Sequence, residues 1–318
     1  MRITILDGKA GELGRLLEAP LKELFDEVQV FDRTSKEEFA QRAPGSEFLL
    51  TNKVPLTSYE MDLCPNLKYV GVMATGFNII DLEEAARRNI AVTNVPAYST
   101  QSVAQMTWAH ILNIASRTGH YAQMVHDGAW CKSPDFSFMD ENVMELSGKV
   151  MGIVGMGQIG SQVARIALAF GMKVLCVTSK SQDALPQGCL KASMEEMLSS
   201  ADIVSLHCPQ TPQNKGMISK LALSKMKPSA MLINTARGGL IDAEAVAEAL
   251  SSGRLLAAGM DVSAIEPMPE DSPLWRLDNC FFTPHIAWAS QEAIERLCGV
   301  IIKNLKAFLS GERLNRVE

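Results

Sequence analysis

Hydrophobic and polar positions form two blocks along the chain, each built from short apolar runs separated by helical patterns. In the first block, β-branched apolar runs predict strands at Ile3–Leu6, Val28–Phe31, Phe48–Leu50, Tyr69–Met73 and Ala91–Asn94. In the second block they predict strands at Val150–Val154, Val174–Val177, Ile203–His207, Met231–Asn234, Ala257–Asp261 and Phe281–Thr283. Strands that alternate with helices are typical of parallel sheets covered by helices on both faces. The pattern predicts an α/β protein with two doubly wound parallel-sheet domains.

Two further helical patterns border the second block. Apolar residues at helical spacing predict one long helix from Ser102 to about Ala129, with Ser102 as its N-cap. After the letters WASQ, a last helical pattern runs to the end of the chain. We expect the long helix to bridge the two domains and the last helix to return to the first one.

A glycine-rich segment follows the first strand of the second block. The strand KVMGIV leads into GMGQIG, which supplies Gly155, Gly157 and Gly160, and then into the helical pattern SQVARIALAF. In a dinucleotide site these glycines allow a tight turn, admit the pyrophosphate and let the helix pack on the strand. The following helix N-terminus offers free N–H groups to phosphate. The segment predicts a dinucleotide site; a glycine-rich turn without a ligand is the alternative. A second segment, DGKAGELG, lacks the middle glycine and is interpreted as a loop.

The choice between NAD(H) and NADP(H) depends on the end of the next strand, in KVLCVTSKSQ. An acidic residue there would hold the ribose hydroxyls and repel a 2′-phosphate. The sequence instead has Thr178, Ser179 and Lys180. A lysine with two hydroxyls suits a phosphate, which favours NADP(H), although a solvated strand end is the alternative.

Three candidate reactive groups follow three successive strands of the second block. Arg237 lies in INTARGGLID, Glu266 in DVSAIEPMPE and His285 in FFTPHIAWAS. Histidine titrates near neutral pH, a carboxylate beside it fixes its tautomer, and a guanidinium can hold a carboxylate through two hydrogen bonds. Together they suit hydride transfer to a 2-keto acid. The other histidines are interpreted as surface or packing residues, except that His207 could equally line the nucleotide pocket.

The first block offers a weaker signal of the same kind. Thr75 and Gly76 form a turn after one strand, where free N–H groups could bind a carboxylate, and Lys53 follows another strand. An ordinary strand–helix turn is the alternative.

Composition narrows the class of protein. The chain of 318 residues is 47% hydrophobic and carries a net charge of -6, which gives no reason to expect nucleic acid or an anionic membrane as partner. Seven scattered cysteines without a C-x-x-C pair argue against a disulfide framework and a thiolate metal site, so we expect no metal. Without a signal-like N-terminus or a long apolar run, a cytoplasmic protein is expected.

The motifs GIVGMGQIG, LINTARGGLID, GMDVSAIEP and TPHIAWAS, in this order and spacing, resemble those of the D-isomer-specific 2-hydroxyacid dehydrogenases. The segments ATGFNIID, NVPAYSTQSVAQ and HIAWAS are most similar to the glycerate dehydrogenase (hydroxypyruvate reductase) branch. The resemblance implies a flavodoxin-like substrate domain over 1–98 and 288–318, and a Rossmann cofactor domain over 99–287. It also implies a homodimer.

The resemblance assigns roles by motif position. Arg237 would orient the keto acid, His285 would be the acid/base and Glu266 would tune it, while Thr75, Gly76 and Lys53 would bind substrate. The residues expected along NAD(H) or NADP(H) are Gly155, Gly157, Gln158, Ile159, Gly160, Thr178, Ser179, Lys180, His207, Cys208, Pro209, Thr235, Ala236 and Asp261. Two positions depart from the family pattern: Thr178 replaces an acid, and Gln105 stands where many relatives have Glu.

The expected reaction is reversible reduction of hydroxypyruvate to D-glycerate. Alternatives are reduction of another small keto acid, such as glyoxylate or pyruvate, or an NAD(H)-sensing corepressor-like role. A phosphoglycerate or formate dehydrogenase fits the sequence less well.

Overall fold

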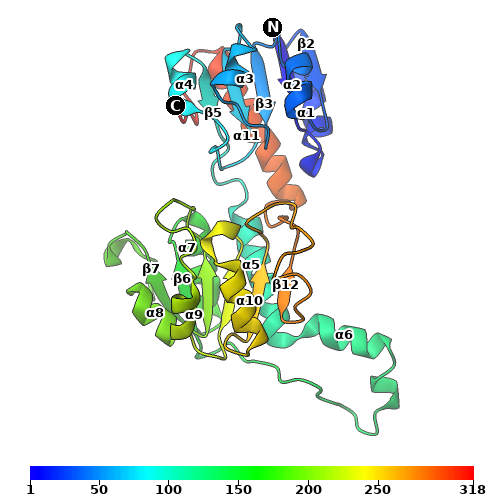
Figure 1. Cartoon of the computed structure of the whole chain (residues 1–318), viewed down its shortest axis with the longest axis vertical. Helices are drawn as coiled ribbons and strands as arrows, with labels where there is room; N and C mark the ends of the chain where they lie inside the picture. Colours follow the sequence, from blue (N-terminus) through cyan, green and yellow to red (C-terminus); the bar gives the residue numbers. More distant parts are fainter. The chain divides into compact units, whose positions relative to one another are not determined.

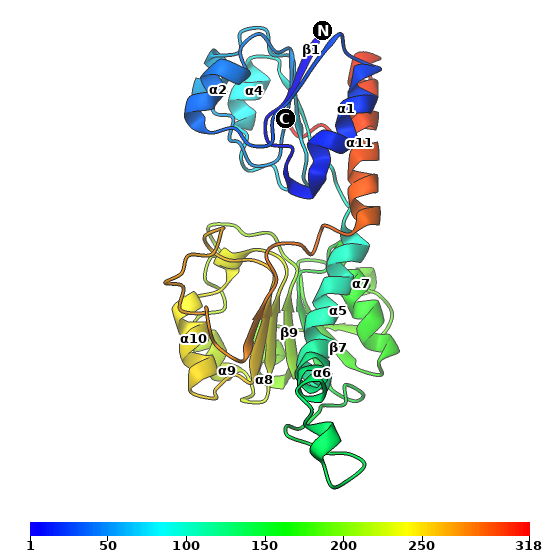
Figure 2. The ribbon, with the colours of Figure 1, turned by 90° about the vertical axis from the view of Figure 1, so that its right-hand side faces the viewer.

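The computed structural model describes residues 1–318 and divides them into two compact units. Unit 1 consists of Met1–Ser99 and Ala289–Glu318, and unit 2 of Thr100–Trp288. Each unit is a parallel sheet between two layers of helices, as Figure 1 and Figure 2 show. The expected α/β class with two doubly wound parallel sheets is therefore confirmed. No helix is long and apolar enough to cross a membrane.

Unit 1 has a five-stranded parallel sheet in the order β2-β1-β3-β4-β5, which is the flavodoxin-like order. Its strands are β1 (Arg2–Ile5), β2 (Glu27–Val30), β3 (Phe48–Thr51), β4 (Tyr69–Val72) and β5 (Ala91–Thr93). Its helices are α1 (Leu13–Lys22), α2 (Lys36–Arg42), α3 (Ser58–Asp62), α4 (Leu82–Arg87) and α11 (Gln291–Leu309). Helix α11 packs beside α1, and its Phe308 ring contacts Phe48 and Tyr69 of the sheet.

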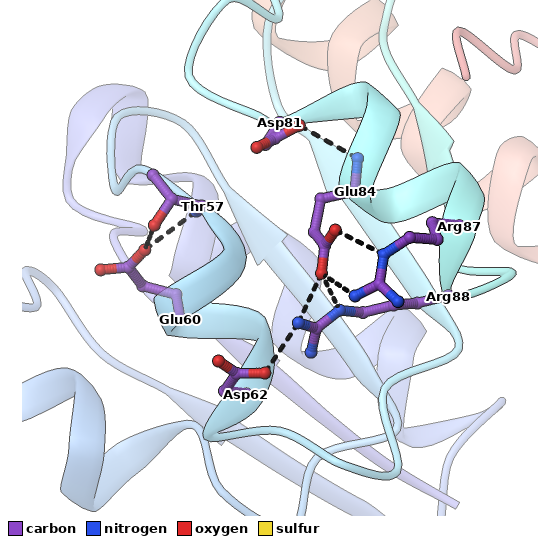
Figure 3. A network of polar contacts seen from close by, with 7 residues as sticks. All are labelled: Thr57, Glu60, Asp62, Asp81, Glu84, Arg87 and Arg88. Carbon is purple, nitrogen blue, oxygen red and sulfur yellow. Dashed lines mark hydrogen bonds and ion pairs between the residues drawn. The ribbon is translucent and has the colours of Figure 1, made fainter.

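Polar side chains connect two of the other helices of this unit, α3 and α4, as Figure 3 shows. The Arg88 guanidinium donates to Glu84 and to Asp62 at 2.7 Å, and so ties the end of α4 to the end of α3. Hydrogen bonds from Arg87 and Arg88 lower the pKa of Glu84 to about 2. Thr57 and Asp81 cap the two helices at their N-termini. The pair of short helices is thereby held in one orientation on the sheet.

Unit 2 has a seven-stranded parallel sheet in the order β12-β11-β10-β9-β6-β7-β8. Its strands are β6 (Val150–Val154), β7 (Lys173–Val177), β8 (Cys189–Lys191), β9 (Ile203–Leu206), β10 (Met231–Asn234), β11 (Ala257–Met260) and β12 (Cys280–Phe282). Counted from β6, this is the Rossmann order extended by one strand. The central strands β9 and β10 are buried throughout, because helices cover both of their faces.

The helices of unit 2 lie in two layers (Figure 2). One layer holds α5 (Thr100–Ser116) and α7 (Gln158–Ala169), and α6 (Thr118–His126) follows α5. The other layer holds α8 (Met194–Ser200), α9 (Lys220–Lys225) and α10 (Ala243–Ser251). Short 3₁₀ helices occur in the chain at Ala10–Glu12 (η1), Trp130–Lys132 (η2), Gln182–Ala184 (η3) and Gly238–Leu240 (η4).

Two details of the predicted elements are wrong, and one strand was not predicted. The single long helix is two helices, because Arg117 takes a left-handed backbone conformation (φ 51°) between α5 and α6. Ser102 lies inside α5 instead of capping it, and its hydroxyl donates to the Ala287 carbonyl at 2.6 Å. Strand β8 was not predicted; it has three residues, of which only Cys189 is buried.

We predict that Gly160→Ala destabilises unit 2 by about 1–3 kcal/mol, because overpacking displaces the helix. A Cβ atom at Gly160 would lie 2.0 Å from the Gly155 carbonyl oxygen, so α7 must move away from the turn. Urea unfolding measures the loss. Gly299→Ala is the matched control, since a Cβ there meets nothing within 4 Å, and it should not destabilise. Equal stability of the two variants would contradict the close packing of α7.

Candidate active site

The candidate reactive residues lie on loops that leave neighbouring strands at the same edge of the unit 2 sheet. Strand β11 pairs with β10 on one side and with β12 on the other, all in parallel. Arg237 follows β10, Glu266 lies in the loop after β11, and His285 follows β12. A Cβ atom at Gly238 would lie 2.0 Å from the Ser263 carbonyl carbon, so the first two loops are in direct contact. Ligands bind at this edge in open α/β sheets.

His285 and Glu266 form a hydrogen-bonded pair. His285 Nδ1 lies 2.7 Å from Glu266 Oε2, and the Ser263 N–H holds Oε1 of the same carboxylate at 3.2 Å. Both side chains are about one-third exposed (30% and 34%), so a ligand can reach them. Because an ionised carboxylate only accepts, Nδ1 must donate, which leaves Nε2 to exchange a proton with a ligand. The geometry is that of an oriented acid/base.

The buried Asp261 carboxylate organises the loop that carries His285. It accepts from the Thr283 hydroxyl at 2.5 Å and from the N–H groups of Ile286 and Ala287 at 3.0 and 2.9 Å. His110 Nε2 lies 3.1 Å from the same hydroxyl, and burial lowers the pKa of His110. Sequence reasoning missed Thr283 and treated His110 as a surface or packing residue. The expected contact of Asp261 with a cofactor remains a prediction.

Arg237 presents an exposed guanidinium whose Nη1 donates to the Ala236 carbonyl at 2.6 Å. Its backbone is held by the side chain of Asn234, the fully buried last residue of β10. Thr235 is also buried, and its hydroxyl lies 2.9 Å from that of Thr107. Little of the Thr235 side chain is therefore available to a ligand, whereas Ala236 is partly exposed.

The glycine loop has the form that a pyrophosphate needs. Gly155 has φ 95°, and a Cβ atom there would lie 2.6 Å from the His207 carbonyl oxygen, so only glycine fits. A Cβ at Gly157 would meet nothing within 4 Å, which leaves the backbone open to a phosphate. Helix α7 begins at Gln158 and Ile159 without a side-chain cap, so its first N–H groups are available to an anion. The predicted residues of this loop thus fit a dinucleotide.

The loop after β7 contains no acidic side chain next to the strand end. Thr178 is partly exposed, Ser179 and Lys180 are exposed, and the Lys180 N–H donates to the Thr178 hydroxyl at 3.2 Å. Lys191 of the unpredicted strand β8 donates to the Lys180 carbonyl at 2.6 Å. Two lysines therefore lie at this loop, and the second could be found only once β8 was placed beside β7.

The predicted segment His207 to Pro209 follows β9 and borders the glycine loop. His207 Nε2 lies 2.8 Å from the Ser205 hydroxyl, and burial lowers the pKa of His207 to about 3. Burial also raises the pKa of the Cys208 thiol. Asn214 donates to the Pro209 carbonyl at 2.8 Å. His207 is thus neutral at physiological pH, and the site gains no charge from it.

Unit 1 carries the remaining predicted residues on its own strand edge. Lys53 is exposed, and the Asp7 carboxylate holds its loop by accepting from the N–H groups of Asn52 at 2.7 Å and Lys53 at 2.5 Å. The Thr75 hydroxyl donates to the Val95 carbonyl at 2.9 Å, which fixes the turn before Gly76. Their role in binding substrate stays a prediction.

A group of potential metal ligands lies outside these loops. One ligand atom each of His120, Asp140 and Glu141 lies within 4.8 Å of the others. His120 Nε2 already contacts Asp140 at 3.0 Å, and Glu141 pairs with Arg117. Each group thus has a partner on the protein without an ion.

The chain matches the family described as D-isomer specific 2-hydroxyacid dehydrogenase, NAD binding domain, over residues 108–287. This chain belongs to that family. This chain is 40% identical over 321 residues to hydroxypyruvate reductase of Blautia hydrogenotrophica, covering 100% of this chain and 99% of the relative. It is 38% identical to glycerate dehydrogenase of Methylorubrum extorquens (89% and 88% covered). It is 36% identical to glyoxylate reductase of Korarchaeum cryptofilum (83% and 79% covered).

Solved structures agree with this assignment. A Thermus thermophilus protein superposes with a TM-score of 0.88 at 35% identity, covering 100% of both chains. An acyclic imino acid reductase in complex with NADPH and D-Arg gives 0.87 at 30% identity, again over both whole chains. D-lactate dehydrogenase from Aquifex aeolicus, complexed with NAD and lactic acid, gives 0.86 at 30% identity and covers 98% and 96%. The family predicted from the motifs is thereby confirmed.

We predict that His207 makes folding sensitive to acid. The pKa of His207 is lowered to about 3 in the folded protein, so the unfolded chain, with a pKa of about 6.5, binds more protons between these values. The stability from neutral His207 is therefore complete above about pH 6.5 and is lost as the pH falls towards 3. The urea midpoint should fall less between pH 7.5 and 5 in His207→Gln than in the wild type. The exposed-histidine control His126→Gln should behave like the wild type; equal slopes for all three would contradict the prediction.

Proposed function

We propose that this dehydrogenase reversibly reduces hydroxypyruvate to D-glycerate with a nicotinamide cofactor. The observation that carries the proposal is the His285–Glu266 pair, which shares a strand edge with Arg237 in a fold that has an open glycine loop. The relatives named hydroxypyruvate reductase and glycerate dehydrogenase support this substrate. They also favour an enzyme over a corepressor-like protein.

The proposed chemistry divides a two-electron reduction between the cofactor and the protein. A reduced nicotinamide supplies the hydride that C2 of the keto acid accepts. As C2 becomes tetrahedral, the proton on His285 Nε2 passes to the developing alkoxide, which becomes the hydroxyl of the product. Glu266 stabilises the imidazolium before transfer and keeps Nδ1 protonated afterwards. In the reverse direction, neutral His285 accepts the hydroxyl proton.

The Arg237 guanidinium has the chemistry to orient the keto acid. It is exposed and carries several donors, of which one Nη1 hydrogen contacts Ala236. A guanidinium can donate two parallel hydrogen bonds to carboxylate and carbonyl oxygens and stabilise negative charge as it develops. The N–H groups of Thr75 and Gly76, with Lys53, remain the proposed further donors to the substrate carboxylate.

Glyoxylate or pyruvate is the second candidate substrate. The glyoxylate reductase relative favours glyoxylate, and the same three side chains would serve it, because both acids present a carboxylate beside a carbonyl. The carbonyl carbon carries a hydroxymethyl group in hydroxypyruvate, hydrogen in glyoxylate and a methyl group in pyruvate. Neither Arg237 nor His285 distinguishes these substituents by its chemistry.

We further propose that the dehydrogenase works as a homodimer through unit 2. The segment after α6 exposes the large apolar side chains of Trp130 (52%), Phe136 (91%), Met139 (79%) and Val143 (57%). A monomer rarely exposes so many apolar side chains on one segment, and a second copy of the chain would cover them.

We predict that His285→Gln lowers kcat for hydroxypyruvate reduction by about 10²–10⁴-fold, the usual contribution of general acid catalysis. Nicotinamide fluorescence should show that NADH binding changes little. Glu266→Gln should lower kcat less, because Gln can accept from Nδ1 but cannot stabilise the imidazolium by charge. His126→Gln is the control. A kcat of His285→Gln near that of the wild type would contradict the acid/base assignment.

We predict that Lys180 binds the 2′-phosphate of NADP(H). Lys180→Ser should lower kcat/KM with NADPH by about 10- to 100-fold, the range expected for one charge-assisted hydrogen bond, and leave kcat/KM with NADH nearly unchanged. Lys220→Ser, on exposed Lys220 of α9, is the matched control. Equal losses with both cofactors, or a wild type that prefers NADH, would contradict the proposed preference.

A further inference from the structure

The loop that carries Arg237 is closed by a single buried side chain. Asn234 ends β10 and has no exposed surface. Its Oδ1 accepts from the N–H groups of Ala236 at 3.1 Å and Arg237 at 3.3 Å, and its Nδ2 donates to the Arg237 carbonyl at 2.9 Å. Both the N–H and the C=O of Arg237 are therefore held by one carboxamide.

Only an amide side chain can make this set of bonds from this position. The planar group must accept on one atom and donate on the other. Aspartate would set an acceptor against the Arg237 carbonyl, and alanine would leave all three backbone contacts unmade. Breaking these hydrogen bonds lowers the stability of the fold. The bonds also fix the backbone from which the Arg237 side chain departs.

The same residue connects the Arg237 loop to the loop after β11. The main-chain carbonyl of Asn234 accepts from the Asp261 N–H at 3.0 Å. The Asp261 carboxylate in turn holds the N–H groups of Ile286 and Ala287, next to His285. The backbone positions of the Arg237 and His285 loops thus depend on Asn234 and Asp261, two buried residues that bond to each other at the ends of adjacent strands.

We infer that Asn234 is a positioning residue that aims the Arg237 guanidinium at the substrate. The inference rests on the proposed function, in which Arg237 orients the keto acid. Arg237 has an extended backbone (φ -150°), and Gly238 packs against Ser263 with no side chain of its own. The carboxamide of Asn234 therefore holds the backbone from which the guanidinium stem departs. Displacement of a substrate-orienting group by about 1 Å can lower the rate by roughly 10²-fold.

The test compares Asn234→Asp and Asn234→Ala with the control Asn279→Ala. Asn279 also holds backbone carbonyls, those of Leu250 and Leu256, but lies outside the three reactive loops. Both Asn234 variants should lower kcat/KM for hydroxypyruvate by about 10- to 100-fold. The dissociation constant of NADH, measured by nicotinamide fluorescence, should stay within about threefold in all variants. Asn279→Ala should keep kcat/KM within about twofold, as expected of a substitution away from the site.

A double-mutant cycle separates positioning from a general structural role. In an Arg237→Ala background there is no guanidinium to aim, so Asn234→Asp should lower kcat/KM by less than about threefold further. Additive losses, or Asn234 variants that match Asn279→Ala, would overturn the inference. Loss of NADH binding in both Asn234 variants would also overturn it, since Asn234 would then hold the cofactor loop as a whole. A wild type that turns over no keto acid would instead contradict the proposed function.

Discussion

The parallel pairing of β10, β11 and β12 is the constraint on which the candidate site depends. Backbone hydrogen bonds align Asn234 with Met260, and Met260 with Phe282, so the three strands end at one level. Arg237, Glu266 and His285 follow these ends, so their loops lie at one edge of the sheet although they are far apart in sequence. Because β10 and β11 are buried on both faces, a shift of their register would expose core residues, so packing fixes the level at which their loops begin.

Buried polar side chains then give each loop its direction. Asn234 and Asp261 stand at the ends of neighbouring strands and bond to the backbone of the loops beyond them. Unit 1 uses the same device, since the Asp7 carboxylate accepts from the backbone of the Lys53 loop. Burial raises the pKa of Asp7, and the N–H donors oppose that shift. A carboxylate or carboxamide after a buried strand thus repeatedly fixes a loop that carries a cation.

The sequence predicted the fold class and the family because both are encoded in local patterns. Apolar runs of strand length marked eleven of the twelve strands, and the glycines around Gly157 marked the nucleotide turn. Strand β8 was not predicted, because its exposed Leu190 and Lys191 give no apolar run. The break between α5 and α6 at Arg117 was not predicted, because apolar residues continue at helical spacing on both sides of Arg117. The roles of Asn234 and Thr283 in holding the loops could not be predicted from the sequence. Their hydrogen-bond partners depend on loop conformations that residue spacing does not encode.

We propose that the residues at this strand edge let hydride reach only one face of C2 of hydroxypyruvate. The most direct measurement follows consumption of NADH and NADPH by the wild-type protein with hydroxypyruvate and resolves the glycerate formed on a chiral column. We expect turnover of hydroxypyruvate that yields D-glycerate alone. Absence of turnover with hydroxypyruvate, glyoxylate and pyruvate, or formation of L-glycerate, would contradict it.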